Sequence, residues 1–127
     1  MRIIFVGIHN KPFLKPLDSS TKTGKLIDRI IKKLPADFEI VKSNIIDNDG
    51  PVPPNQILDY ANEWYWNIEP QDNDVIVLLG VDVQKIHKNL RQVGNLIKVA
   101  HPAYKKSHIA MNEYVEDVAC KIKNYCT

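Results

Sequence analysis

Four polar side chains follow apolar stretches of the sequence and have the chemistry to recognise a flat ring. They are two histidines and two asparagines: His9, Asn10, Asn44 and His101. Imidazole and carboxamide groups donate and accept hydrogen bonds in one plane, which suits a planar heterocycle. None of the four is a carboxylate, and this limits the acid–base chemistry available to them.

Each of these residues also has a purely structural interpretation. Asn44 can cap a turn, His9 can face solvent from a loop, and His101 before Pro102 can belong to a rigid turn. Their convergence at one place favours a binding site, and that convergence depends on the elements that carry them.

The apolar pattern predicts four strands that alternate with four helices. Two of the strands are continuous runs of aliphatic, aromatic and β-branched residues, typical of strands buried on both faces. We expect Gly7 to end the first strand, so that His9 and Asn10 lie in a loop, and Gly94 to cap the third helix. The strands are expected at 2–7, 38–46, 74–79 and 96–100, and the helices at 21–34, 54–68, 82–93 and 107–125.

This order of elements predicts an α/β fold, because strands that alternate with helices form parallel sheets covered on both faces. We expect a three-layer α/β/α sandwich with a four-stranded parallel sheet in the order 2-1-3-4, as one domain over residues 1–127. In such sheets ligands bind at the carboxyl ends of the strands. The two histidines, the two asparagines and Gly80 should all lie at that edge.

Composition excludes several classes of protein. The net charge of +2 is too small to dictate a polyanionic partner by itself. Cys120 and Cys126 lack partners at metal-ligand spacing, so no metal site and no cofactor are expected. No signal peptide or membrane-length apolar stretch is present, and we expect a cytoplasmic protein, by default a monomer.

The pair Gly24-Lys25 invites interpretation as a phosphate-binding loop, but the pattern fails. Ser19 stands where the first glycine of that motif belongs, and Leu26 stands where its metal-binding hydroxyl belongs. The amino terminus of the first helix still has free N–H groups that could hold an anion.

The motifs and their order resemble those of the uracil-DNA glycosylase superfamily, most closely its mismatch-specific and thermophilic branches. The resemblance covers most of the chain as an order of elements, but only three short stretches as chemistry. Those three stretches are Gly7–Pro12, Asn44 and His101–Ala103; the further matches are the Thr23–Asp28 helix start and the strand that ends at Gly80.

The resemblance implies a role for each matching residue. His101 would stabilise the departing base, and either Asn10 or His9 would position the attacking water. Asn44 would read the edge of the base. Gly7 and Ile8 would complete the base pocket, with Phe13 as the candidate for the aromatic stacking residue.

The chain departs from the family pattern at several points. Ala103 replaces the serine of the His-Pro-Ser loop, and the iron–sulfur cysteines of the thermophilic branch are absent. The chain is also short for the family, so the loop that enters the duplex would be reduced to residues 104–107. The groups expected to contact the DNA backbone are Lys11, Lys105, Lys106 and Ser107.

The functional expectation is a glycosylase that hydrolyses the N-glycosidic bond of a flipped uracil or mismatched base in DNA. A non-catalytic nucleotide- or nucleic-acid-binding module on the same fold is the main alternative. A flavodoxin-like or nucleotide-sugar-binding domain is a third, although no glycine-rich phosphate turn follows the first strand.

Overall fold

A computed structural model of the chain describes residues 1–9, 15–46 and 52–126. It contains one sheet of four parallel strands in the order β2-β1-β3-β4, as the sequence predicted. Three of the helices, α1, α2 and α4, span eleven residues or more. The strands are β1 (Arg2–His9), β2 (Glu39–Ile46), β3 (Val75–Leu79) and β4 (Asn95–Val99), and the helices are α1 (Lys22–Lys32), α2 (Ile57–Ile68), α3 (Val81–His87) and α4 (His108–Cys126).

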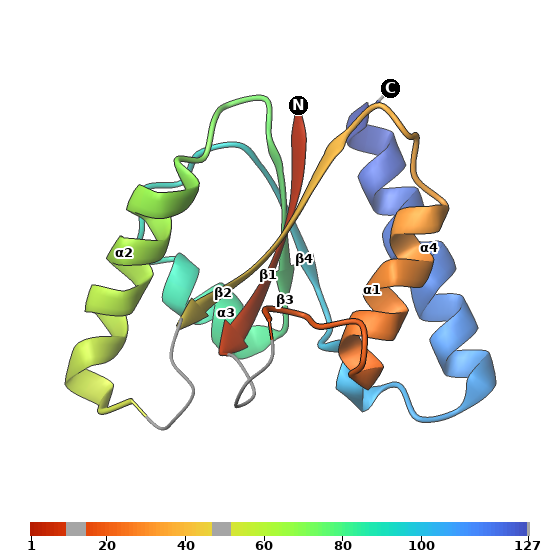
Figure 1. Ribbon diagram of the computed structural model, residues 1–127, viewed down its shortest axis with the longest axis horizontal. Helices are drawn as coiled ribbons and strands as arrows, with labels where there is room; N and C mark the ends of the chain where they lie inside the picture. The colour runs from red at the N-terminus through yellow and green to blue at the C-terminus, as the bar shows by residue number, and fades with distance from the viewer. Residues whose placement is uncertain (10–14, 47–51, 127) are drawn as a thin grey trace.

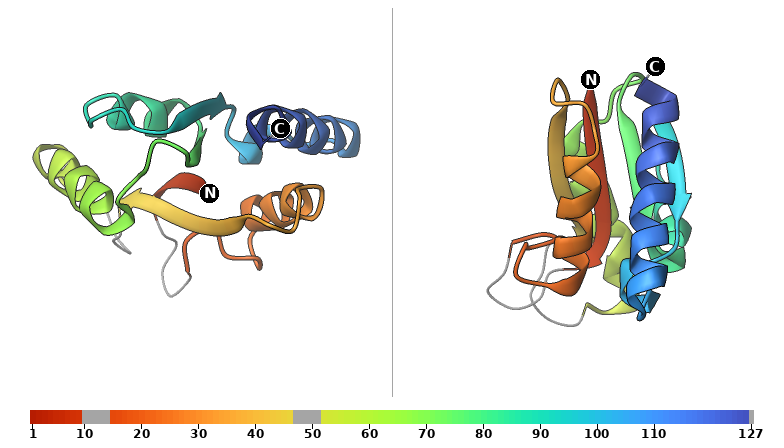
Figure 2. Two further views of the ribbon diagram at one scale, coloured as in Figure 1. Left: turned by 90° about the horizontal axis from the view of Figure 1, so that it is seen from above. Right: turned by 90° about the vertical axis from the view of Figure 1, so that its right-hand side faces the viewer.

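The helices cover the two faces of the sheet in pairs, which gives the three layers of the predicted sandwich (Figure 1). Helices α1 and α4 lie side by side over one face (Figure 2, right). Their apolar residues, such as Ile27 and Val118, pack on Phe5 and Val77 of the sheet. Helices α2 and α3 cover the opposite face, where Trp64 packs with Ile4 and Leu78. All four strands end at the lower edge in Figure 1, so this edge is the carboxyl edge of the sheet.

The first strand is longer than predicted, which corrects two expectations. Gly7 does not end β1; it pairs with Asn44, and the strand continues to His9, which pairs with Ile46. His9 therefore lies in a strand and not in the loop after it. The glycine serves close packing at this position, as shown below, and not a change of chain direction.

The third helix is shorter than predicted. It ends at His87, where the amide of Leu90 bonds to the His87 carbonyl and the Gln92 carboxamide donates to the same oxygen. Gly94 lies seven residues beyond this end and does not cap the helix. It has a positive φ of 88°, and a Cβ there would lie 2.9 Å from the carbonyl oxygen of Asp74. Gly94 therefore permits a tight approach between the start of β4 and the turn before β3.

A buried aspartate ties the amino edge of the sheet together. The carboxylate of Asp74 accepts the amide and the guanidinium of Arg2, at 3.1 and 2.8 Å, and the amide of Gln71 at 2.9 Å. The Asp74 carbonyl also accepts the amide of Asn95. Burial by itself would raise the pKa of Asp74, but these hydrogen bonds outweigh it and hold the pKa below its usual value.

A second buried polar group is the side chain of His87, the last residue of α3, which faces α2. The imidazole of His87 is almost completely buried and packs edge-on against Trp64, with ring centroids 5.6 Å apart. The indole N–H of Trp64 donates to the Ser43 hydroxyl, which in turn donates to the carbonyl of Phe5. Among the described residues, the Nδ1 atom of His87 has no hydrogen-bond partner. Burial lowers the pKa of His87, a hydrogen bond with Gln92 opposes this in part, and the charge of Lys98 adds to the lowering.

Candidate functional site

The carboxyl edge of the sheet carries two of the polar residues that the sequence singled out, at the two outer strands. Asn44 lies near the end of edge strand β2, and His101 follows β4 at the other side of the sheet. Each of them packs against a glycine of the central strand region, Asn44 against Gly7 and His101 against Gly80. The two contacts are built on the same principle, since a glycine leaves the space that a polar side chain fills.

The first contact joins β1 and β2. A Cβ atom at Gly7 would lie 2.4 Å from Oδ1 of Asn44, a distance that no side chain tolerates without displacing the carboxamide. Asn44 is 6 % exposed, so its carboxamide is enclosed at the end of the strand and is not a solvent-facing turn cap. Gly7 therefore fixes where the Asn44 side chain lies.

The second contact joins the end of β3 to the turn after β4. Gly80 has φ 100° and ψ 164°, a conformation that is essentially restricted to glycine. A Cβ there would also lie 3.1 Å from Cβ of His101. Gly80 is the N-cap of α3 and leaves room for the imidazole. This explains why a glycine must follow the apolar strand β3 at this point.

The protonation state of His101 follows from its hydrogen bond. Nδ1 accepts the amide of Ala103 at 3.1 Å, so the proton of the neutral ring must lie on Nε2. Burial lowers the pKa of His101, and the nearby carboxylate of Asp82 opposes this only in part, so the ring is neutral at pH 7. Within the described part of the chain, Nε2 has no hydrogen-bond acceptor, so His101 presents one N–H donor at this edge.

The turn after His101 is the short helix η2 (Pro102–Tyr104), and three of the predicted backbone-contact residues, Lys105, Lys106 and Ser107, follow it directly. Tyr104 is 79 % exposed, and its ring lies 6.0 Å from that of His101. Lys105 lies over the ring of Tyr114, and Lys106 is exposed. Ser107 accepts the amide of Ala110 and caps α4, so its hydroxyl already has a structural role.

The segment before α1 is held against this edge by contacts that the sequence analysis missed. The ammonium group of Lys42 bonds to Asp28 at 2.6 Å and to the carbonyl of Leu17 at 3.2 Å. Leu17 has a positive φ of 51°, which is unusual for a bulky residue, and its side chain packs against Gly7. No local sequence signal marks either contact, because Lys42 and Leu17 are ordinary residues for a strand and a loop.

The amino terminus of α1, where free N–H groups could hold an anion, is capped in part by the chain itself. The Thr21 hydroxyl accepts the amide of Gly24, which caps the helix. A Cβ at Gly24 would lie 1.8 Å from the carbonyl oxygen of Asp18, so the preceding turn covers the first turn of the helix. Gly24 is therefore a packing residue.

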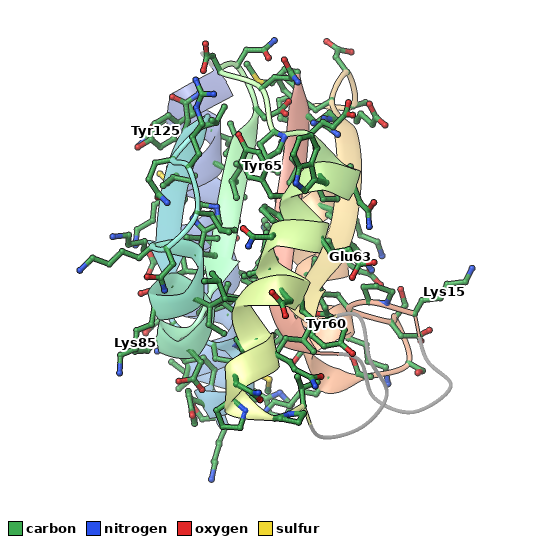
Figure 3. All side chains as sticks on the ribbon, turned by 90° about the vertical axis from the view of Figure 1, so that its left-hand side faces the viewer. Lys15, Tyr60, Glu63, Tyr65, Lys85 and Tyr125 are labelled. Carbon is green, nitrogen blue, oxygen red and sulfur yellow. The ribbon has the colours of Figure 1, made fainter. Side chains whose placement is uncertain are left out.

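A small pocket opens beside Asn44 at the edge of β2. Its volume is about 170 Å³, and it is enclosed by Pro16, Lys42 and Asn44 on one side and by helix α2 on the other. Figure 3 shows Tyr60 and Glu63 on the side of α2 that faces β2, with Lys15 beyond the strand. The mixture of a phenol, a carboxylate and amides suits a polar, hydrogen-bonding ligand group.

Several predicted site residues cannot be placed beside these groups. Asn10, Lys11 and Phe13 lie outside the described residues. His9 is described only as the last residue of β1. Ile8 is partly buried and packs on the α2–α3 face of the sheet.

The described residues contain no group of three or more His, Cys, Asp or Glu side chains arranged to hold a metal ion. None of their helices is long and apolar enough to cross a membrane. Comparisons with protein-family models, with curated proteins and with solved structures found no match to this chain.

Proposed function

We propose that the carboxyl edge of the sheet binds a nucleobase of DNA, and that the protein hydrolyses the N-glycosidic bond of uracil or of a mismatched base. The observation that carries the proposal is the hydrogen bond from the Ala103 amide to Nδ1 of His101, which leaves Nε2–H as a donor at the carboxyl edge of the sheet. The enclosed carboxamide of Asn44 supports it from the other side of the sheet. The reaction that the resemblance implies is removal of a base from DNA. It needs a hydrogen-bond donor such as the imidazole and a group that reads the base edge such as the carboxamide.

The chemistry follows from where charge develops. When the bond between the sugar C1′ and the base N1 breaks, its electron pair stays on the base, and the negative charge spreads to O2. The sugar becomes cation-like, and a water molecule attacks C1′ from the opposite face. The proton that this water loses ends on the base anion, so the products are the sugar with a hydroxyl at C1′ and the neutral free base. A neutral N–H donor at O2 stabilises this transition state without first having to lose or gain a proton. His101 would supply that donor.

Asn44 would provide selectivity for the base. A carboxamide can donate to the O4 oxygen of uracil and accept from its N3–H at the same time. Replacement of Asn44 by aspartate turns the donor into an acceptor, so base preference should shift from uracil toward cytosine. Competition binding with the free bases measures this shift, and an unchanged preference would assign Asn44 to turn packing alone.

DNA binding would depend on the lysines that follow His101. Lys105 and Lys106 follow His101 by four and five residues and would contact phosphates on either side of a flipped nucleotide. Such contacts set affinity and its dependence on salt, and they leave the chemistry to His101.

The test is single-turnover excision together with DNA affinity, for wild type and His101→Ala. Oligonucleotides carrying uracil, hypoxanthine, or a G:U or G:T mismatch cover the expected substrates, each as single strand and as duplex. We expect excision by His101→Ala to fall by a factor on the order of 10²–10³, the usual loss for one such donor, with nearly unchanged affinity. His108→Ala is the matched control, because His108 is an exposed histidine of the same region.

Two outcomes would contradict parts of the proposal. Equal excision rates for wild type and His101→Ala would remove His101 from the mechanism. Binding of these oligonucleotides by the wild type without excision of any base would place the protein in the non-catalytic class.

A further inference from the structure

Tyr114 of α4 contacts the chain around His101 at two points: Ala100, just before the imidazole, and Lys105, after it. Its hydroxyl donates to the carbonyl oxygen of Ala100 at 2.6 Å. The ammonium group of Lys105 lies 6.0 Å from the centre of its ring, within the range of a cation–π contact. The residue is 5 % exposed, and burial raises the pKa of its hydroxyl, so the group remains a protonated donor.

The hydrogen bond to Ala100 acts on the residue immediately before His101. Ala100 follows the last residue of β4, where the ladder of the sheet no longer holds the chain. On the other side of His101, Pro102 fixes its own φ, and the amide of Ala103 bonds to Nδ1. The Tyr114 hydroxyl is thus a tertiary contact that fixes the chain on the amino-terminal side of the imidazole, next to the Val99 carbonyl that Gly80 and Gln84 hold.

We propose that Tyr114 is a positioning residue for His101, which it aligns through the Ala100 carbonyl while its ring face holds Lys105. The inference rests on the proposed function, since it assigns to Tyr114 the orientation of the donor and of one phosphate contact. One side chain thereby links the group that contacts the base to a group that contacts the DNA backbone. The hydroxyl serves the first role and the ring serves the second.

This division of roles separates the proposal from ordinary core packing. The neighbouring residues of α4 that face the sheet, Val115, Val118 and Ile122, are apolar and supply the burial that holds the helix in place. A hydroxyl needed only for packing would change stability when removed, with no effect on the tautomer of His101. A positioning hydroxyl must change the imidazole itself.

Tyr114→Phe removes the hydroxyl and keeps the ring, and Lys105→Met removes the charge and keeps the hydroxyl. In Tyr114→Phe we expect single-turnover excision to fall by about 10-fold, because small misplacements of a reacting group are costly, with DNA affinity within about twofold of wild type. In Lys105→Met we expect a several-fold loss of DNA affinity, with a normal His101 tautomer. Tyr125→Phe, on the same helix and partly exposed, is the matched control.

Two measurements on the free protein test the positioning without any substrate. Nitrogen chemical shifts of His101 report which ring nitrogen carries the proton, and amide exchange at Ala103 reports the bond to Nδ1. Wild type should show the Nε2–H tautomer and a protected Ala103 amide. In Tyr114→Phe we expect a mixture of tautomers and exchange at Ala103 that is faster by about 10-fold or more.

The outcomes distinguish this proposal from the proposed function. Unchanged tautomer and unchanged exchange in Tyr114→Phe would overturn the role of Tyr114, whatever the excision rates are. If the wild type excises no base, the proposed function fails, and the two spectroscopic measurements alone decide the role of Tyr114. A lower stability of Tyr114→Phe with a normal His101 would assign the hydroxyl to packing.

Discussion

The two ends of the sheet use polar groups in opposite ways. At the amino edge, the carboxylate of Asp74 accepts three hydrogen bonds, from the amide and the guanidinium of Arg2 and from the amide of Gln71. All three donors belong to the protein. At the carboxyl edge, His101 uses one ring nitrogen for its own turn and presents the other away from it. Both ends contain a glycine with positive φ: Gly94 at the first and Gly80 at the second.

The difference shows that the polar groups of the amino edge stabilise the fold, whereas those of the carboxyl edge leave a hydrogen-bond donor available. A buried charge with every hydrogen bond satisfied holds strands together but can do nothing else. A neutral donor positioned by glycine contributes less to stability and remains available to a ligand. The comparison predicts that substitutions at the amino edge will lower stability without affecting His101, whereas those at the carboxyl edge will also change His101.

The largest effect is expected from Asp74→Ala. This change leaves the Arg2 guanidinium and two backbone amides without their acceptor, and breaking a buried pair in this way costs about 3 kcal/mol or more. Urea unfolding at pH 7 measures the loss. The surface pair of Lys33 and Glu116 provides the control, because Glu116→Ala removes only an exposed ion pair and should leave the unfolding curve nearly unchanged.

The lowered pKa of Asp74 adds a test in acid. A carboxyl group with a depressed folded-state pKa stabilises the protein above the usual aspartate pKa of about 3.9. That contribution disappears as the pH falls through the folded-state pKa. Wild type should therefore lose more stability between pH 5 and pH 2 than Asp74→Asn. Parallel curves for the two proteins would mean that the Asp74 charge is not part of the amino-edge network.

The next effect compares the two glycines directly. Gly80→Ala and Gly94→Ala each force alanine into a conformation with positive φ and a close contact, at a cost of about 1–3 kcal/mol. Only Gly80→Ala should also displace His101, because its new methyl group would meet the imidazole-bearing side chain. Unfolding curves measure the first effect, and the nitrogen shifts of His101 measure the second. A shift of His101 in Gly94→Ala would show that the two ends are coupled.

The smallest effect is expected at His87, the last residue of α3, which packs against Trp64 of α2. Because its folded-state pKa is below the unfolded value of about 6.5, the unfolded chain binds the proton more readily, and stability falls as the pH drops below that value. The slope is at most about 1.4 kcal/mol per pH unit for one group. His87→Phe keeps a ring against Trp64 and should flatten the curve between pH 7 and pH 5. His108→Phe should retain the wild-type curve, and a flattened curve for it would contradict the assignment.

Much of the fold could be predicted because its signals are local. The continuous apolar runs of β1 and β3 identify central strands, and alternation with helices fixes a parallel sheet. The end of α3 could not be predicted, because the helical pattern continues through Leu90 and Val93 while the Gln92 side chain bonds the His87 carbonyl. The extent of β1 was also wrong, since glycine was interpreted as a strand end and here makes room for Asn44.

For the site, strand-end positions indicated Asn44 and His101, and topology alone brings them to one edge. The tautomer of His101 depends on a hydrogen bond from Ala103, which a sequence does not reveal. Asp74 and Arg2 escaped notice because they are 72 positions apart and have no shared motif. The roles proposed for Asn10 and Phe13 remain predictions.

The edge-on contact of Trp64 with His87 gives the protein an internal optical reporter. The chain has two tryptophans, of which Trp64 is buried and Trp66 is 74 % exposed. A charged imidazole at 5.6 Å quenches indole emission more strongly than a neutral one, so the blue-shifted fluorescence of Trp64 should dim when His87 takes up a proton. Emission from solvent-facing Trp66 stays as an internal reference. Replacing Trp66 with phenylalanine would leave Trp64 as the single emitting tryptophan. Its fluorescence alone would then report the titration of His87.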